Sequence, residues 1–194
     1  MIKNLAKVVR VISVPPVMIC GLLLILYLTR RSLFAGTGQL LYALLFLMVI
    51  PILAYPVSYL VPSLRKKGRE GQRSLAFLFT LAGYTGGIIY AFAAGVGDGL
   101  LLIFLTYFLS VAAMILLQKG FHQRASGHAC SMTGPLILLS YFIGWWCILP
   151  CAAFFAIIVW ASLSLKRHTP KELVLGSLTA AVSFLLGLLL VGLL

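Results

Sequence analysis

Acidic residues are almost missing from this sequence. Its 194 residues include only three of them, Glu70, Asp98 and Glu172, against 15 lysines and arginines. Charged residues of both signs make up 9% of the chain, whereas hydrophobic residues make up 62%. A water-soluble domain of this size needs many more polar residues to cover its surface. The composition therefore excludes a soluble globular protein and indicates one integral membrane domain over residues 1–194.

The shortage of acids leaves a strong excess of positive charge, which favours anionic lipid or phosphate as a partner. Nucleic acid fits less well, because the basic residues lie in short segments between apolar runs and no soluble domain offers a binding groove. The cysteines, too, lie in or beside apolar runs and lack metal-ligand spacing, so we expect free thiols and no metal site there. They are Cys20, Cys130, Cys147 and Cys151.

Long apolar runs fill most of the chain. A helix needs about 20 mostly apolar residues to cross a bilayer, and only helices suit runs of this length. We predict an all-α polytopic membrane bundle of about seven transmembrane helices. Their ranges are about 8–29, 39–61, 74–94, 99–118, 129–146, 147–165 and 170–194.

Seven crossings would place alternate loops on the same side of the membrane. All lysines and arginines except Arg30 and Arg31 then share the side of the N-terminus, together with all three histidines. The positive-inside rule makes this side cytoplasmic, in the cell membrane. Which side of the membrane carries these residues is left open by the sequence, because cations that bind phosphate do not report topology.

The segment "RASGHAC", residues 124–130, is the first polar cluster on that side. Ser126 is suited to cap the helix that follows, and Gly127 lets a ligand approach the backbone closely. His128 then lies at a helix N-terminus, where free N–H groups and the helix dipole attract anions. This pattern favours a phosphate-binding position.

The segment "KRHTPKE", residues 166–172, is the second cluster. Thr169 is a predicted N-cap, Pro170 the first helical residue, and Glu172 the returning partner of a capping box. His168 therefore also lies beside a helix N-terminus on the same side. Two histidines and several cations at such helix ends predict a phosphate site.

Both segments resemble signatures of the type 2 phosphatidic acid phosphatase superfamily. "ASGHA" is similar to P-S-G-H, and "LSLKRHTPKELVLGSL" is similar to S-R-x5-H-x3-D followed by a small-residue helix. The basic stretch "RKKGREGQR" and the order of spans resemble a short prokaryotic branch of that superfamily. The resemblance implies a six-helix core, a membrane lipid phosphate as substrate, and hydrolysis without a metal or other cofactor.

The resemblance also implies roles for individual residues. His168 would be the nucleophile that forms a phospho-histidine, and His128 the general acid, with a slightly raised pKa. Glu172, in place of the usual aspartate, would hold His168 in the required tautomer. Ser126, the N–H of Gly127 and nearby cations would bind the non-bridging phosphate oxygens.

This sequence departs from the signatures at the phosphate ligands. Ser162 stands where the third signature has arginine, so a bidentate phosphate clamp is missing, and Lys166 or Arg167 could replace it. The first signature, K-x6-R-P, is absent. Its possible substitutes are Arg124 and Arg73, which we favour, then Lys119, and also Arg69.

We therefore expect a phosphatase that acts on phosphatidic acid, phosphatidylglycerol phosphate or a polyprenyl pyrophosphate. The alternative is a catalytically degenerate relative that binds anionic lipid or serves as a scaffold, and Ser162 favours it. A small transporter ranks last, because it would need ionisable groups at mid-membrane. The sequence does not indicate an oligomeric state.

Overall fold

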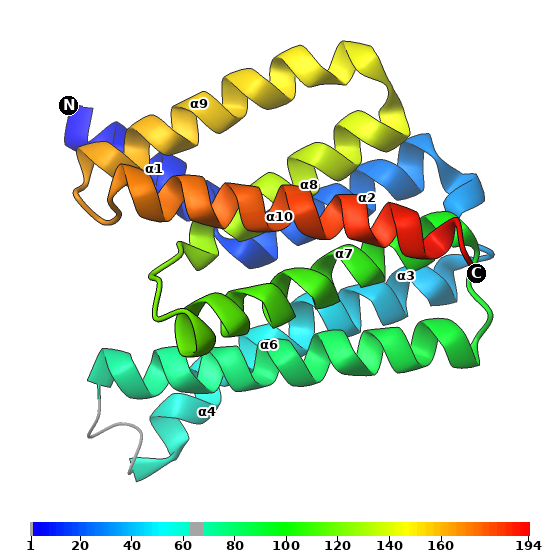
Figure 1. Ribbon diagram of the computed structural model, residues 1–194, viewed down its shortest axis with the longest axis horizontal. Coiled ribbons are helices and arrows are strands. Elements are labelled where there is room, and N and C mark those ends of the chain that lie inside the picture. The colour runs from blue at the N-terminus through cyan, green and yellow to red at the C-terminus, as the bar shows by residue number, and fades with distance from the viewer. Residues whose placement is uncertain (1, 63–67) are drawn as a thin grey trace.

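The computed structural model describes residues 2–62 and 68–194, and this described part is helical and contains no strand (Figure 1). The predicted all-α bundle is therefore confirmed. The α-helices are α1 (Ile2–Ile12), α2 (Pro15–Thr29), α3 (Thr37–Leu44), α4 (Ile50–Leu60), α6 (Gly68–Ala93), α7 (Asp98–Ile115), α8 (Gly127–Ile143), α9 (Ile148–Ser164) and α10 (Pro170–Val191). The short elements are the 3-10 turns Arg31–Leu33 and Trp145–Cys147 and the π-helical turns Leu45–Val49 and Leu116–Gly120.

In the described part of the chain, five helical stretches are long and apolar enough to cross a membrane, so the chain is a membrane protein. They are Thr37–Leu60, Ser74–Ala93, Asp98–Gly120, Trp145–Ser164 and Pro170–Val191. The predicted first span is instead the pair α1 and α2, bent by 55°, which brings the number to six if the pair is one span. The predicted fifth span corresponds to α8, which has only 17 residues.

Prolines explain the two main interruptions. Pro15 begins α2, and the bend before it follows because proline has no N–H to donate to the preceding turn. Pro51 follows the π-helical turn Leu45–Val49, where the ring would otherwise crowd the carbonyl of Leu47. The first break bends α1 against α2 by 55°, whereas the second lies within the single helical stretch Thr37–Leu60.

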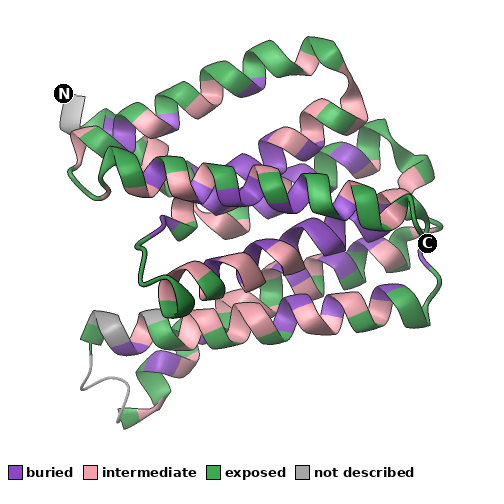
Figure 2. Ribbon diagram, viewed as in Figure 1, coloured by how far each residue is buried: buried purple, intermediate pink, exposed green. Residues whose placement is uncertain are grey.

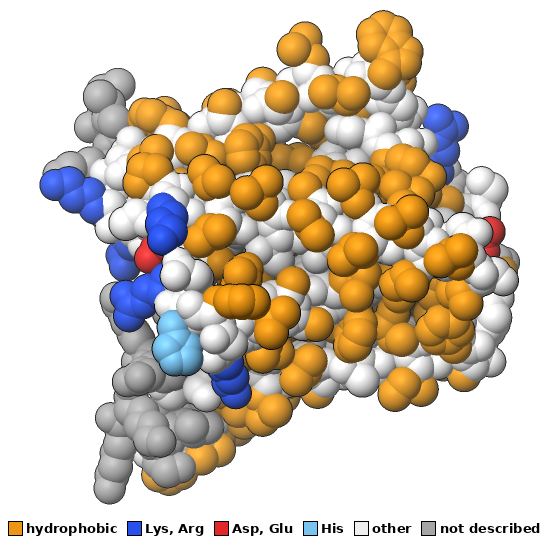
Figure 3. Space-filling model, viewed as in Figure 1, with side chains coloured by type: hydrophobic (Ala, Val, Ile, Leu, Met, Phe, Trp, Pro, Cys, Tyr) orange, Lys and Arg blue, Asp and Glu red, His pale blue; other side chains and the backbone are white. Residues whose placement is uncertain are grey.

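Helix α7 lies at the centre of the bundle. It packs against α6 on one side and α10 on another, while α10 also packs along α8. Phe104 and Ile103 on α7 are fully buried in the main apolar core (Figure 2). Large apolar side chains cover the outside of the helices, as contact with lipid requires (Figure 3).

The two ends of the bundle differ in charge. The site end, as we name it, holds α1, the segment 121–126 and the segment 165–169, and blue lysine and arginine side chains gather there (Figures 1 and 3). The far end holds the connection after α2, the turn between α6 and α7, and the turn at Gly144. The chain therefore brings its two polar segments, 124–130 and 166–172, to one end.

Candidate active site

A cavity of about 750 Å³ lies at the site end, between the α1–α2 bend, α4, α6, α7, α8 and the start of α10. Its charged wall comes from the helix ends. This wall consists of Arg10, Arg124, His128, Arg167, His168 and Glu172. Its apolar wall reaches into the bundle and includes Pro51, Ile52, Phe77 and Met114. The cavity thus joins a cationic pocket to a hydrocarbon-like surface, as an amphiphilic anion would require.

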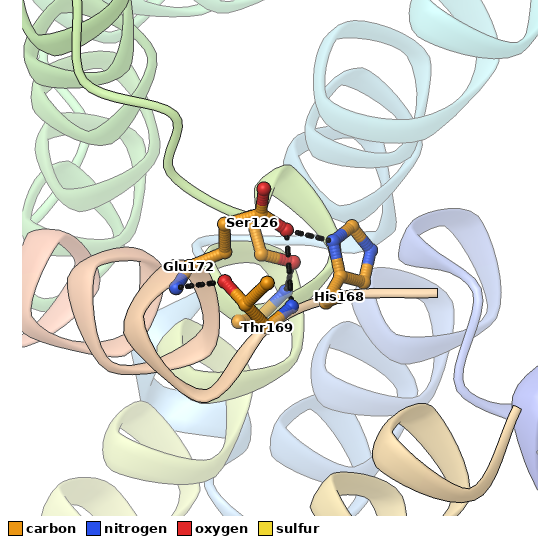
Figure 4. A network of polar contacts seen from close by, with 5 residues as sticks. Ser126, His168, Thr169 and Glu172 are labelled. Carbon is orange, nitrogen blue, oxygen red and sulfur yellow. Dashed lines mark hydrogen bonds and ion pairs between the residues drawn. The ribbon is translucent and has the colours of Figure 1, made fainter. Parts of the chain in front are cut away.

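His168 is held by the carboxylate of Glu172. The two residues are four positions apart in the sequence, and His168 Nδ1 lies 3.2 Å from Glu172 Oε2 (Figure 4). The same oxygen accepts from the backbone N–H of Thr169 at 3.3 Å, and Thr169 Oγ1 accepts from the N–H of Glu172 at 3.3 Å. The predicted capping box is therefore confirmed. When Nδ1 donates to the carboxylate, Nε2 of His168 carries the free lone pair.

Ser126 joins the start of α8 to the start of α10. Its Oγ accepts from the N–H of Ala129 at 3.1 Å, and its N–H donates to the carbonyl of Glu172 at 2.9 Å. A Cβ at Gly176 would overlap the Ser126 carbonyl oxygen, so only glycine permits this approach. Ser126 is 1% exposed and lies outside the cavity lining. The structure thus places its hydroxyl as a helix cap, whereas Gly127 lines the cavity.

His128 contacts a residue that the sequence reasoning did not single out. Its Nε2 lies 3.2 Å from Oγ of Ser13, in the α1–α2 bend. Ser13 is fully buried, and its Oγ also donates to the carbonyl of Arg10 at 3.3 Å. With that hydrogen committed, the Ser13 oxygen is free to accept from an N–H at Nε2 of His128.

The pKa of His128 is lowered, whereas the sequence analysis expected it to be slightly raised. His128 is the second residue of α8 and precedes the apolar stretch 129–146. Burial, the positive charge of Arg10 and the neighbouring imidazole of His168 lower the pKa of His128 to about 4. His128 is therefore neutral at pH 7 in the free site. A bound phosphate would oppose the charge repulsion and raise this pKa again.

Of the predicted phosphate ligands, Arg124 and Arg167 line the cavity, whereas Lys119 and Lys166 do not. The side chains of Arg69 and Arg73 lie outside the described residues. Ser162 is 1% exposed and also lies outside the cavity lining.

Arg10 was missed by the sequence reasoning. It lines the cavity, and its Nη1 is buried without a hydrogen-bond partner among the described residues. A charged residue inside the predicted span 8–29 is itself a signal for a functional position. Pro15 and Pro16 follow it, at the 55° bend between α1 and α2 that brings this part of the chain to the cavity.

Among the described residues, three guanidinium groups and two histidines line the cavity beside a single carboxylate, so the cavity is suited to an anion. No group of three His, Cys, Asp or Glu side chains that could hold a metal ion occurs in the described part of the chain. All four cysteines are free thiols, as expected. Compared with protein-family models, curated proteins and solved structures, the chain matches none. Its chemistry is therefore inferred from the residues of the cavity.

Proposed function

We propose that this protein is a membrane phosphatase that hydrolyses a lipid phosphate or polyprenyl pyrophosphate through a phospho-histidine. One observation carries the proposal: His168, held by Glu172, and His128, held by Ser13, line the same cation-rich cavity. The resemblance of residues 124–130 and 166–172 to type 2 phosphatidic acid phosphatases supports it, and we propose that the chain is a divergent member of that superfamily.

The first half-reaction uses both histidines. The lone pair on Nε2 of His168 attacks phosphorus, and the bond from phosphorus to the lipid oxygen breaks. His128, protonated when the phosphate is bound, gives its proton to the leaving oxygen. Glu172 stabilises the charge that develops on His168 through the bond to Nδ1.

The second half-reaction restores the site. Water attacks phosphorus of the phospho-histidine and gives a proton to His128, which is now neutral. The phosphorus–nitrogen bond then breaks, inorganic phosphate leaves, and His168 is regenerated. Neither step draws on a metal or a cofactor, and all proton transfers pass through His128.

Phosphate binding in this proposal depends on arginines from separate elements. Arg10, Arg124 and Arg167 would bind the non-bridging oxygens, with the N–H of Gly127. Arg10 would supply the guanidinium that the third signature lacks at Ser162. This substitution from another helix is consistent with a buried, unpaired Nη1 on Arg10.

The topology follows from the same reasoning. We propose seven crossings, with α1–α2 and the short α8 each counted as one, in the cell membrane. The cation bias favours a cytoplasmic site end. His122→Cys, in a chain without native cysteines, would react with an impermeant thiol reagent only after cells are opened. Labelling of intact cells would reverse the orientation.

The decisive experiment is phosphate release by the purified protein in detergent with EDTA present. The panel is phosphatidic acid, phosphatidylglycerol phosphate and a polyprenyl pyrophosphate, tested with wild type, His168→Ala and His128→Ala. We expect release from at least one lipid and its loss in both variants, while His122→Ala, an exposed loop histidine, stays active. A phospho-histidine trapped by acid quench would support the covalent step.

Ser162 favours a second candidate, a degenerate relative that binds anionic lipid without turnover. Under that reading no lipid on the panel releases phosphate, yet anionic lipid still raises the Tm. Equal release from wild type and His168→Ala would also reject the phospho-histidine route.

A further inference from the structure

A second polar group lies deeper in the same cavity, on α7. Tyr107 is 4% exposed, and its Oη is buried without a hydrogen-bond partner among the described residues. Tyr107 lines the cavity together with Tyr84, whose ring packs edge-on against it at 5.5 Å between centroids. Buried hydroxyl groups are usually hydrogen-bonded, so an unpaired one on a residue that lines a cavity points to a ligand group as its partner.

The depth of this hydroxyl follows from the pairing of α7 with α8. The two helices run in opposite directions, and a Cβ on Gly127 would lie 3.9 Å from Cε of Met114. Met114 is therefore level with the start of α8, next to His128. Tyr107 precedes Met114 by two helical turns, which places its backbone about 10 Å farther into the bundle.

Among the described residues no neighbouring hydroxyl group is hydrogen-bonded to Tyr107. Thr106 Oγ1 donates instead to the carbonyl of Leu102 at 2.8 Å. Ser110 lies one turn nearer the histidines and also lines the cavity. A strip of hydroxyl groups thus follows α7 inward from the charged wall, between apolar residues.

We propose that Tyr107 binds an ester carbonyl of the substrate, so that the substrate class is a glycerolipid phosphate. This inference rests on the proposed function. The ester carbonyls of a glycerolipid lie a few bonds from the phosphate, at the start of its acyl chains, and Tyr107 lies farther into the bundle than the start of α8, where the apolar part of the lipid would enter. A polyprenyl chain offers no hydrogen-bond acceptor at that depth and would leave the hydroxyl unpaired.

The test compares three lipids on the full-length protein in mixed micelles: a diacylglycerol phosphate, its ether-linked analogue, and a polyprenyl phosphate. We expect wild type to favour the diacyl lipid. Tyr107→Phe should lower kcat/KM for the diacyl lipid about tenfold, as the loss of one buried hydrogen bond predicts. It should leave kcat/KM for the other two lipids within about twofold. Tyr141→Phe, which removes a hydroxyl outside the cavity, is the matched control.

Folding is checked by the Tm without lipid, which Tyr107→Phe should leave unchanged or raise, because it removes an unpaired buried hydroxyl. Equal kcat/KM losses for all three lipids, or no loss for the diacyl lipid, would overturn the inference. Absence of turnover with every lipid would instead reject the proposed function. Binding then decides the inference: Tyr107→Phe must reduce the Tm rise caused by the diacyl lipid but not that caused by its ether analogue.

Discussion

The two ends of this bundle use arginine in opposite ways. At the far end, Arg30 donates from Nε to the carbonyl of Phe142 at 2.7 Å and from Nη2 to that of Ile143 at 3.0 Å, closing the end of α8. Arg31 lies over the ring of Tyr27, 4.8 Å from its centroid. These arginines already have partners within the protein and act as structural contacts.

At the site end, the described arginine side chains that line the cavity lack such partners. Those of Arg10, Arg124 and Arg167 make no hydrogen bond or ion pair with another described residue, and all three line the cavity. Keeping like charges together costs free energy unless an anion is bound. The far end shows that this fold can provide hydrogen-bond and aromatic partners for arginine side chains. The three arginines that line the cavity lack such partners among the described residues and are available to a ligand.

The largest expected effect concerns the acids, which also differ between the ends, but in the opposite sense to the arginines. Glu172 binds His168, whereas Asp98 begins α7 at the far end. We expect Glu172→Gln to lower kcat about 10³-fold, because an amide does not stabilise the charge on His168. Glutamine still suits the capping box, so the Tm should stay nearly constant.

Phosphate release and thermal unfolding of both variants would check this. Asp98→Asn is the matched control and should keep kcat within about twofold. If Glu172→Gln lowers the Tm strongly while the remaining folded protein keeps its kcat, Glu172 is only a helix cap.

A second pair of variants tests the arginines directly. Arg10→Ala should lower kcat/KM about 50-fold, since a charge-assisted hydrogen bond contributes about 1.5–3 kcal/mol. Its Tm should not fall, because the guanidinium has no hydrogen-bond partner among the described residues to lose and its buried Nη1 is removed. Arg30→Ala should do the reverse: it leaves two carbonyls at the end of α8 unpaired and lowers the free energy of unfolding by about 1–2 kcal/mol.

Phosphate release per folded molecule and the Tm together separate the two roles. The comparison between the ends breaks down if Arg10→Ala unfolds the protein as Arg30→Ala does and the surviving fraction is fully active.

Local features of this molecule were predictable from sequence. Apolar runs located the long helices, because lipid contact and helix length are set by consecutive residues. The cap at Ser126 and the capping box of Thr169 and Glu172 were also predictable, since each involves residues three apart. The gathering of His128 and His168 at one end followed from the order of the spans.

Contacts between distant segments were not predictable in the same way. The hydrogen bond between Ser13 and His128 joins residues 115 positions apart and depends on the 55° bend of α1 against α2. The position of Arg10 in the cavity depends on that bend as well. Tyr107 was hidden for another reason: a tyrosine in an apolar helix is ordinary core sequence, and only its unpaired hydroxyl distinguishes it.

A smaller effect is expected at Ser13. Ser13→Ala removes the acceptor at Nε2 of His128 and should lower kcat about fivefold with KM nearly unchanged, because one neutral hydrogen bond is lost. Ser13→Thr keeps the hydroxyl and should restore most of the activity. Ser140→Ala, which removes a hydroxyl bonded within α8 away from the site, should leave kcat unchanged. Equal kcat in Ser13→Ala and wild type would show that Ser13 does not position His128.

The smallest expected effect is a dependence of stability on pH at the site end. Burial beside Arg10 and His168 lowers the pKa of His128 to about 4, from the usual value of about 6.5. Between these values the unfolded chain binds more protons than the folded protein, so stability falls as the pH falls from about 6.5 to 4.

Between pH 7 and 5 the Tm of wild type should fall about 3 °C more than that of His128→Asn. The Tm of His122→Asn, a variant in the exposed loop, should fall as much as that of wild type. Inorganic phosphate should reduce the fall in wild type, since an anion beside Arg10 offsets the charge repulsion that disfavours protonated His128. An equal fall in wild type and His128→Asn would mean that His128 titrates freely and that its burial in the cavity is not maintained.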